Sequence, residues 1–308
     1  SAFFYLRRTG RIGSIRLLVR VHERRWDQRP TREPSIFDPG PKWKRRSGLN
    51  IVAMGLSRQI VAFGGGGFSM ESGNPLLDDF VRSLTGLKKP RICFLPTASG
   101  DADHYIVRFY NNMRDCSEAS HISLFRRERG VGNIRDHLLA QDMIYVGGGS
   151  VINMLAVWRA HGIDEILREA WERGIVLCGL SAGSLCWFTD AMTGYQDDAK
   201  RVEGLGFLPH SNAVHFEFGS SRHTAYENEI KAGLTPGYAA TDGAALHFIG
   251  TELAQVVASR PEARAYRLEM RGDRPYTTQI ATRYLGSIDH IPLVGEPSLE
   301  WSSSPIAA

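Results

Sequence analysis

Short apolar segments that alternate with amphipathic ones constrain the fold of this chain more than any other feature of its sequence. From residue 58 onward the two kinds of segment follow one another: strand-like runs at 60–63, 91–95, 121–125, 143–146 and 174–178, and helix-like runs at 76–84, 103–114, 133–140, 151–161 and 164–172. Strands separated by helices are typical of a mostly parallel sheet with helices on both faces. The sequence therefore predicts an α/β fold.

The alternation ends near residue 236. Beyond it, strand-like runs follow one another without clear helices between them, at 238–241, 244–249, 254–258 and 264–270. Consecutive strands joined by short turns favour antiparallel pairing. We expect an antiparallel extension at the C-terminal side of an α/β domain that spans residues 54–285, followed by a tail at 286–308.

The first 53 residues differ in composition from the remainder. They contain 11 arginines and 2 lysines against 2 glutamates and 2 aspartates, a net charge of +9. Since the whole chain carries +4, residues 54–308 carry −5. We predict a basic, disordered extension at 1–53; an organellar presequence and a basic arm for nucleic acid are the alternatives. The acidic remainder does not favour nucleic acid as a partner.

Composition and cysteine spacing exclude several classes of protein. No apolar run approaches the roughly 20 residues that a membrane-spanning helix needs. None of the four cysteines forms a C-x-x-C pair, and Cys93 and Cys178 lie in strand-like runs. We therefore expect reduced thiols, a cytoplasmic location and no zinc site. The sequence leaves the oligomeric state open, and a homodimer is one of the states considered.

Four glycines, residues 64–67, follow the first strand-like run and suggest a dinucleotide-binding turn. The pattern G-x-G-x-x-G fails in both registers, because its last position is Ser69 or Met70. The chain also lacks G-x-x-x-x-G-K-[ST], so a nucleotide-binding P-loop is excluded. No cofactor is expected.

The segment LCGLSAGS, residues 177–184, places Ser181 in the pattern Gly179-x-Ser181-x-Gly183. Ser181 thus lies between the strand-like run at 174–178 and a helix expected over 182–188. This arrangement is typical of a nucleophile elbow, in which small flanking residues let the serine hydroxyl project from a tight turn. The alternative is a tight turn without chemistry. We predict that Ser181 is a nucleophile.

A second glycine turn, Gly147-Gly148-Gly149-Ser150, also follows a strand and opens a helix. In a parallel sheet it should lie at the same edge as Ser181. The backbone N–H of Gly148 or Gly149, together with that of Ala182, would then form an oxyanion hole. The alternative is a turn that serves only to join strand and helix.

Candidates for the base and the acid lie downstream of Ser181. His215 lies in the short apolar run NAVHFEF, after a loop expected at 204–211, and ranks first among ten histidines, ahead of His210 and His247. Asp242 follows a strand-like run and precedes a glycine, so its carboxylate should face the same edge of the sheet. The other acids considered are Asp190, Asp197, Asp198 and Glu217. The order Ser, His, acid differs from that of α/β-hydrolases, which place the acid before the histidine.

Taken in order, four motifs resemble one known family. They are VGGGS at a helix start, GLSAGS at the elbow, HF 34 residues after Ser181, and TDGAAL beyond it. This set resembles peptidase E, the aspartyl dipeptidase family of serine peptidases, which is related to cyanophycinase. The resemblance covers roughly residues 58–270. It implies a flavodoxin-like sheet similar to that of class I glutamine amidotransferases, and a site without a metal.

The resemblance also implies roles for individual residues. Ser181 would be the nucleophile, His215 the base and Asp242 the acid, with Ala182 and one of two glycines, Gly148 or Gly149, as oxyanion donors. Ser150 stands where the family's glycine turn usually ends in Asn or Asp, and it is a candidate substrate-binding residue. Arg222, seven residues after His215, is the candidate cation for the carboxylate of an N-terminal aspartate, although an exposed loop arginine is the alternative.

We therefore expect a serine peptidase that hydrolyses small peptides, chiefly dipeptides with an N-terminal aspartate, through an acyl-enzyme. Two alternatives use the same serine: an esterase, and a hydrolase of isoaspartyl or cyanophycin-type bonds. A different class is a non-catalytic protein whose basic arm contacts nucleic acid.

Overall fold

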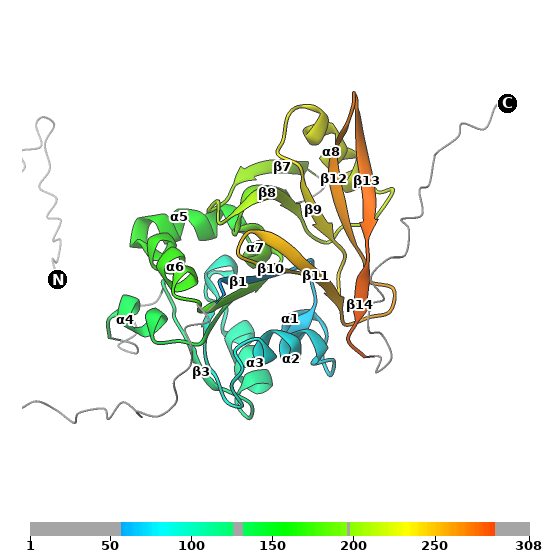
Figure 1. The fold of residues 1–308 in the computed structure, drawn as a ribbon. Helices are drawn as coiled ribbons and strands as arrows, with labels where there is room; N and C mark the ends of the chain where they lie inside the picture. Colours follow the sequence, from blue (N-terminus) through cyan, green and yellow to red (C-terminus); the bar gives the residue numbers. More distant parts are fainter. Residues whose placement is uncertain (1–56, 126–131, 196–197, 287–308) are drawn as a thin grey trace, which may run out of the picture. The chain divides into compact units, whose positions relative to one another are not determined.

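A computed structural model describes residues 57–125, 132–195 and 198–286 (Figure 1). The extension predicted at 1–53 and all but the first residue of the tail predicted at 286–308 lie outside these residues, so both remain predictions.

The described residues form two sheets with helices around them (Figure 1). The strands are β1 (Gln59–Phe63), β2 (Arg91–Leu95), β3 (Glu118–His121), β4 (Met143–Val146), β5 (Val176–Leu180), β6 (Phe188–Tyr195), β7 (Asp198–Glu203), β8 (Leu208–Ala213), β9 (Gly237–Ala240), β10 (Ala244–Ile249), β11 (Glu252–Ala258), β12 (Ala265–Arg271), β13 (Arg274–Ile280) and β14 (Thr282–Tyr284). The helices are α1 (Gly67–Met70), α2 (Leu76–Ser83), α3 (Asp103–Met113), α4 (Ile134–Leu139), α5 (Val151–His161), α6 (Ile163–Glu172), α7 (Ala182–Leu185) and α8 (Ser221–Lys231), with a 3₁₀ turn at Thr97–Ser99.

The first sheet has eight strands in the order β14-β11-β10-β1-β5-β4-β2-β3. Strands β1, β5, β4, β2 and β3 run parallel, whereas β10 is antiparallel to β1 and β11 is antiparallel to β10. The mostly parallel sheet and its antiparallel C-terminal extension are therefore confirmed. The fifth parallel strand of the sequence, β5, lies in the middle of the sheet, next to β1.

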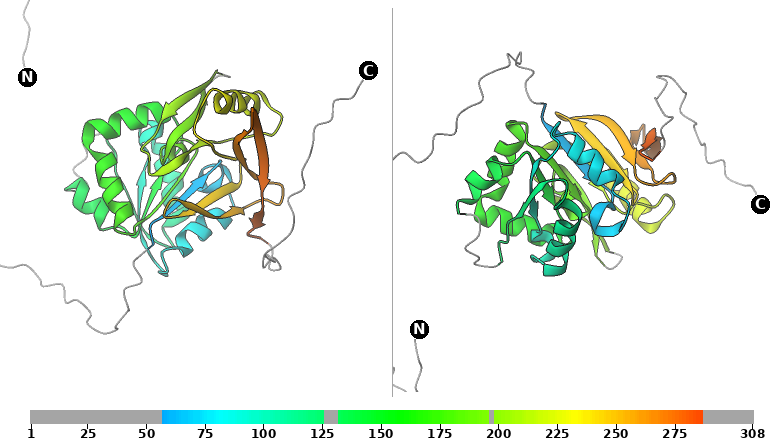
Figure 2. Two further views of the ribbon diagram at one scale, coloured as in Figure 1. Left: turned by 45° about the horizontal axis from the view of Figure 1, so that its top comes forward. Right: turned by 90° about the horizontal axis from the view of Figure 1, so that it is seen from below.

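Helices cover both faces of this sheet, as the sequence predicts (Figures 1 and 2). Alternate residues of each central strand point to opposite faces, so that Val61 and Phe63 pack with α2 and α3 while Ile60 and Ala62 pack on the side of α4 to α7. Aromatic side chains dominate the first side, where the ring of Phe68 contacts those of Phe94, Tyr105, Phe109 and Tyr145.

The second sheet has six strands in the order β13-β12-β9-β8-β6-β7, and it corrects several sequence-based predictions. The helix expected over 182–188 ends at Leu185, and it is followed by strands β6 and β7, which pair antiparallel and are called the β6–β7 hairpin below. Residues 204–211 were expected to be a loop, but β8 begins within them at Leu208, and α8 was not predicted. The strand expected at 121–125 lies earlier, at Glu118–His121.

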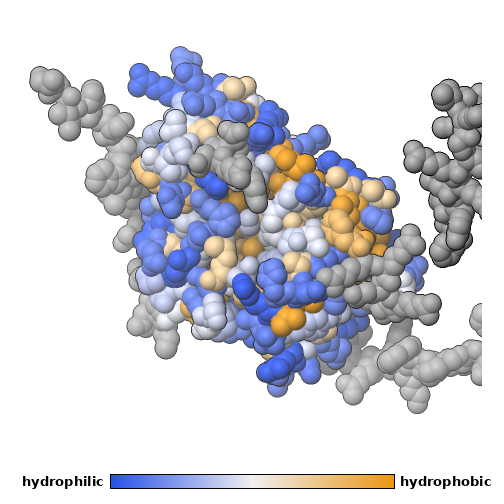
Figure 3. All heavy atoms as spheres, turned by 180° about the vertical axis from the view of Figure 1, so that it is seen from behind, coloured by the Kyte–Doolittle hydropathy of each residue, from blue (hydrophilic) through white to orange (hydrophobic). Residues whose placement is uncertain are grey.

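Apolar side chains of β6, β8, β9 and β12 belong to the same buried cluster as those of β1, β4 and β5, so one continuous core joins the two sheets. The opposite face of the second sheet is covered by α8. The view in Figure 3 shows mainly hydrophilic residues, with apolar ones in small separate groups. Within the described ranges no helix has the length and apolar character that crossing a membrane requires.

Candidate active site

Ser181 lies directly after β5, in the turn before α7, as the elbow pattern predicts. Its backbone has φ 52° and ψ −114°, a combination that residues other than glycine rarely adopt. Small neighbours make this turn possible: a Cβ on Gly179 would lie 2.2 Å from the carbonyl oxygen of Gly183, and one on Gly183 would lie 2.4 Å from that of Val146. The glycines of the motif are therefore required by close backbone contacts.

His215 lies two residues after the end of β8, also with a positive φ of 50°. Its backbone N–H donates to the carbonyl oxygen of Gly64 at 3.1 Å, which fixes it against the turn after β1. Its imidazole Nε2 is 3.0 Å from Ser181 Oγ, and its Nδ1 is 2.5 Å from Asp242 Oδ1. The structure thus brings together the three residues that the sequence predicts as nucleophile, base and acid.

Asp242 lies in the turn between β9 of the second sheet and β10 of the first. Burial alone raises the pKa of its carboxyl group, but the hydrogen bond from His215 and the nearby charges of Arg260 and Arg222 outweigh burial, so the pKa lies below its ordinary value. The ionised carboxylate accepts the Nδ1–H of His215. This leaves the Nε2 lone pair facing the hydroxyl of Ser181.

The first glycine turn supports this arrangement, a role that sequence reasoning missed. A Cβ on Gly65 would lie 2.1 Å from Asp242 Oδ1 and 2.9 Å from His215 Cε1. The carbonyl oxygen of Gly65 accepts the N–H of Gly243 at 3.0 Å. The run of four glycines after β1, which fits no nucleotide motif, was the available signal for a close approach of other residues.

Buried polar side chains also connect the elbow to the segment that carries His215. Asn212 Nδ2, near the end of β8, donates to Ser184 Oγ on α7 at 3.0 Å, and both residues are buried. Near the turn that carries Asp242, Glu71 forms an ion pair with Arg260 at 2.8 Å and accepts a hydrogen bond from Ser259 at 2.7 Å. Neither set carries a motif that could be recognised in the sequence.

Three of the alternative bases and acids, His247, His210 and Asp190, have other partners. His247 is bonded to Gln59 at 2.9 Å, and burial lowers its pKa to about 4. The ring of His210 packs against Tyr238 and Phe248. Three further acids were considered: Asp190 accepts from Arg201, Glu217 is exposed, and Asp198 begins β7. Asp197 lies outside the described residues.

The second glycine turn reaches Ser181, and its two candidate amides differ. The N–H of Gly148 donates to the hydroxyl of Tyr105 at 3.0 Å. The N–H of Gly149 has no hydrogen-bond partner among the described residues. Ala182 is the first residue of α7, so its N–H has no partner within the helix. Gly149 and Ala182 therefore offer the open donors beside Ser181.

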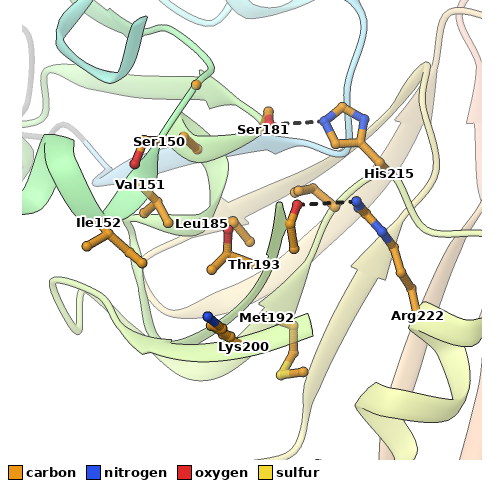
Figure 4. A pocket seen from close by; sticks show the side chains of 14 residues that line it. Ser150, Val151, Ile152, Ser181, Leu185, Met192, Thr193, Lys200, His215 and Arg222 are labelled. Atoms are coloured by element: carbon orange, nitrogen blue, oxygen red, sulfur yellow. Dashed lines mark hydrogen bonds between the residues drawn. The ribbon is translucent and has the colours of Figure 1, made fainter. Parts of the chain in front are cut away.

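A pocket of about 180 Å³ adjoins Ser181 and contains both predicted substrate-binding residues (Figure 4). Ser150 lines it, but its hydroxyl caps α5 by accepting the N–H of Asn153 at 3.3 Å. Arg222 extends from α8 and donates to the carbonyl oxygen of Gly194 at 3.3 Å. Lys200, from β7, also lines the pocket and was not predicted from the sequence. None of the described lining residues is acidic.

Metal-ligating side chains do not cluster in the part of the chain that the structure describes: no group of three His, Cys, Asp or Glu residues there is arranged to hold an ion. The four cysteines are free thiols, and Cys93, Cys178 and Cys186 are buried.

Comparisons with known proteins agree with the fold and with the sequence motifs. Residues 60–256 match Peptidase family S51. The "Uncharacterized peptidase YgaJ" of Bacillus subtilis (strain 168) is 44% identical over 232 residues, which cover 74% of this chain and 100% of that protein. A peptidase from an acI-B1 Actinobacterium has a similar fold, with a TM-score of 0.52 at 20% identity over 73% of this chain and 98% of that one. A putative peptidase E from Listeria monocytogenes EGD-e is 14% identical, with a TM-score of 0.44 over 73% of this chain and 100% of that one. On the family match and the 44% identity, the chain belongs to peptidase family S51.

Proposed function

We propose that this chain is a serine peptidase that hydrolyses short peptides with an N-terminal aspartate through a Ser181–His215–Asp242 triad. One observation carries the proposal: the imidazole of His215 lies between the hydroxyl of Ser181, at 3.0 Å, and the carboxylate of Asp242, at 2.5 Å. A serine hydroxyl is a weak nucleophile alone and needs an adjacent base that a third group orients.

In the proposed reaction, Ser181 Oγ attacks the carbonyl carbon of the peptide bond while His215 Nε2 accepts the hydroxyl proton. Asp242 holds the Nδ1–H and stabilises the imidazolium that forms. The negative oxygen of the tetrahedral intermediate is placed near the N–H groups of Ala182 and Gly149. His215 then donates its proton to the leaving amine, and an acyl-enzyme remains. Water attacks the acyl carbon by the same steps and releases the first residue.

The pocket beside Ser181 supports an acidic first residue. Arg222 and Lys200 place two positive charges along its wall, and no described lining residue is acidic. Arg222 is anchored through Gly194, so its guanidinium is pre-positioned for a planar carboxylate. We assign this pocket to the side chain of the N-terminal aspartate.

The substitution Ser181→Ala tests the nucleophile. It should lower kcat for Asp-Leu by several orders of magnitude, because it removes the hydroxyl that attacks the peptide carbonyl, while circular dichroism stays unchanged. A fluorophosphonate should form an adduct on Ser181, located by peptide mass spectrometry. Full activity of the alanine variant, or an adduct on a different residue, contradicts the proposal.

A substrate panel separates the remaining hydrolase classes. Asp-Leu, β-Asp-Leu, Leu-Leu and a nitrophenyl ester are compared by kcat/KM under identical conditions. We expect Asp-Leu to be the best substrate. A preference for β-Asp-Leu would indicate an isoaspartyl or cyanophycin-type hydrolase, and activity limited to the ester would indicate an esterase.

A further inference from the structure

A second depression lies against Ser181 and His215, apart from the pocket assigned to the N-terminal residue. Its volume is about 270 Å³, and it shares only Gly149, Ser181 and His215 with that pocket. Its other lining residues come from α1, α3, the second glycine turn and the end of β5. The reactive hydroxyl thus lies where two depressions meet, and a peptide bond at Ser181 would extend into both.

One positively charged side chain, that of Arg108, lines this second depression. Arg108 and His104 lie four residues apart on α3, so they share one face of the helix, and both are exposed. Arg108 forms no ion pair with any described residue; its Nη1 donates to the backbone carbonyl oxygen of Ser69, which holds the guanidinium beside α1. The described residues that line the depression include no acidic side chain.

An apolar side chain also lines this depression, next to Arg108. Met70, the last residue of α1, is 49% exposed although its neighbour Phe68 is buried in the aromatic cluster. Tyr105 and Gly148 line the depression and are joined by a hydrogen bond, in which the hydroxyl of Tyr105 accepts the N–H of Gly148. The depression therefore combines a tyrosine held by a hydrogen bond, the flexible apolar side chain of Met70, and Arg108, whose other N–H groups are available to a ligand.

We propose that this depression binds the residue that leaves on hydrolysis, and that Arg108 pairs with its free α-carboxylate while Met70 contacts its side chain. The inference rests on the proposed peptidase function. A dipeptide with an N-terminal aspartate carries one carboxylate on each side of the scissile bond, and the site carries cations on each side of Ser181. Arg108 is thus a specificity-determining residue that favours dipeptides, because an amide or a longer chain has no charge at that position.

The experiment compares Asp-Leu with Asp-Leu amide, which differ only in this charge. We expect the wild-type protein to prefer the free acid in kcat/KM by about 10- to 100-fold, the range for a charged hydrogen-bonded pair. Arg108→Gln should reduce this preference to less than about threefold, mainly through a higher KM for the acid. Arg114→Gln, at the end of the same helix and paired with Asp115, is the matched control and should keep the wild-type preference.

The outcomes separate the inference from the function on which it rests. If Arg108→Gln keeps the wild-type preference, Arg108 does not bind the carboxylate and the inference is wrong, whereas loss of activity in Ser181→Ala still supports the peptidase. If Arg222→Gln abolishes the preference instead, the leaving residue occupies the other pocket and the assignment is overturned. If the wild-type protein hydrolyses neither peptide, the proposed function fails and this inference fails with it.

Discussion

Two residues of the candidate site, Ser181 and His215, have positive backbone φ angles, which residues other than glycine rarely adopt. Among the described residues only one other non-glycine residue, Asp101, has such an angle. A residue held in a sparsely populated conformation costs about 1–3 kcal/mol and persists where the surrounding structure enforces it. That both members of the Ser–His pair bear this cost is consistent with selection for the placement of their side chains.

Gly65 offers a direct test of the packing behind the triad. Gly65→Ala introduces a Cβ that would lie 2.1 Å from Asp242 Oδ1, so the carboxylate or the turn must shift. We expect kcat for Asp-Leu to fall by about 100-fold or more, because small displacements of catalytic groups have effects of this size. The decrease should be seen in steady-state kinetics while the circular dichroism spectrum is preserved.

The matched control is Gly272→Ala in the turn between β12 and β13. Gly272 has a φ of 58°, but a Cβ there would meet no atom within 4 Å. It should reduce the free energy of unfolding by about 1 kcal/mol and leave kcat unchanged. Equal kinetic effects of the two substitutions would show that the contact at Gly65 is unimportant.

Asp242→Asn tests the orientation of the imidazole. The asparagine amide can donate to Nδ1, which favours the tautomer with a proton on Nε2 and removes the acceptor that Ser181 needs. We expect kcat to fall by about 10⁴-fold, the loss known for this change in serine-protease triads, with KM much less affected. Activity within tenfold of the wild type would exclude Asp242 as the orienting acid.

At the scale of elements, sequence patterns predicted those strands and helices whose burial is strongest. Strands β1, β2, β4 and β5 are almost fully buried, so their apolar runs are unambiguous. Strand β7, with the sequence DAKRVE, and β13, with RPYTTQI, lack such runs because they are edge strands of the second sheet. Helix α8 is largely polar and packs through a few residues. Its pattern resembles that of a loop.

The contact between α2 and β4 should make stability depend on pH. Asp78 is 2% exposed and accepts a hydrogen bond from Tyr145 at 3.0 Å, and burial raises its pKa from 3.8 to about 7. The folded state therefore binds a proton that the unfolded state has already lost between pH 4 and 7. This contribution to stability is fully present below pH 4 and is lost as the pH rises to 7; it amounts to at most roughly 4 kcal/mol.

Asp78→Asn should remove this dependence, because the amide is neutral at every pH. Relative to the wild type, the variant should gain stability steadily from pH 4 to pH 7, as measured by urea unfolding at several pH values. Asp79→Asn is the control, since the Asp79 side chain is 53% exposed and paired with Arg82. A difference between Asp78→Asn and wild type that does not change with pH would contradict the assignment.

At the scale of the whole molecule, the candidate site depends on both sheets. Ser181 follows a strand of the first sheet, His215 follows a strand of the second, and Asp242 lies between strands of each. The sequence suggested all three residues through local motifs, strand ends and resemblance to a family. It did not show that a second sheet carries the base, because pairing between distant strands leaves no periodic signal in the intervening chain.

Since one core joins the sheets, we expect the described region to unfold in a single cooperative transition. Phe248 of β10 is fully buried, and its ring packs against those of Phe188 and Tyr238 from the second sheet, with ring centroids 5.7 and 5.5 Å apart. Phe248→Ala should destabilise the fold by about 3–5 kcal/mol. In urea, the change in tryptophan fluorescence and the loss of hydrolytic activity should coincide in this variant, at a lower urea concentration than in the wild type.

Ile249→Ala, at the 46% exposed neighbouring position, is the control and should change stability by less than about 1 kcal/mol. If activity in the Phe248→Ala variant disappears in a separate transition before the fluorescence change, the two sheets unfold independently and the expectation is wrong.

The β6–β7 hairpin bears on how proteins built in this way diverge. It contributes Met192, Thr193 and Lys200 to the wall beside Ser181, yet none of the three hydrogen-bonded residues comes from it. These pocket-lining residues can therefore change while Ser181 keeps its hydrogen bond to His215. Proteins that share this scaffold can then differ in substrate through the hairpin residues that line the pocket.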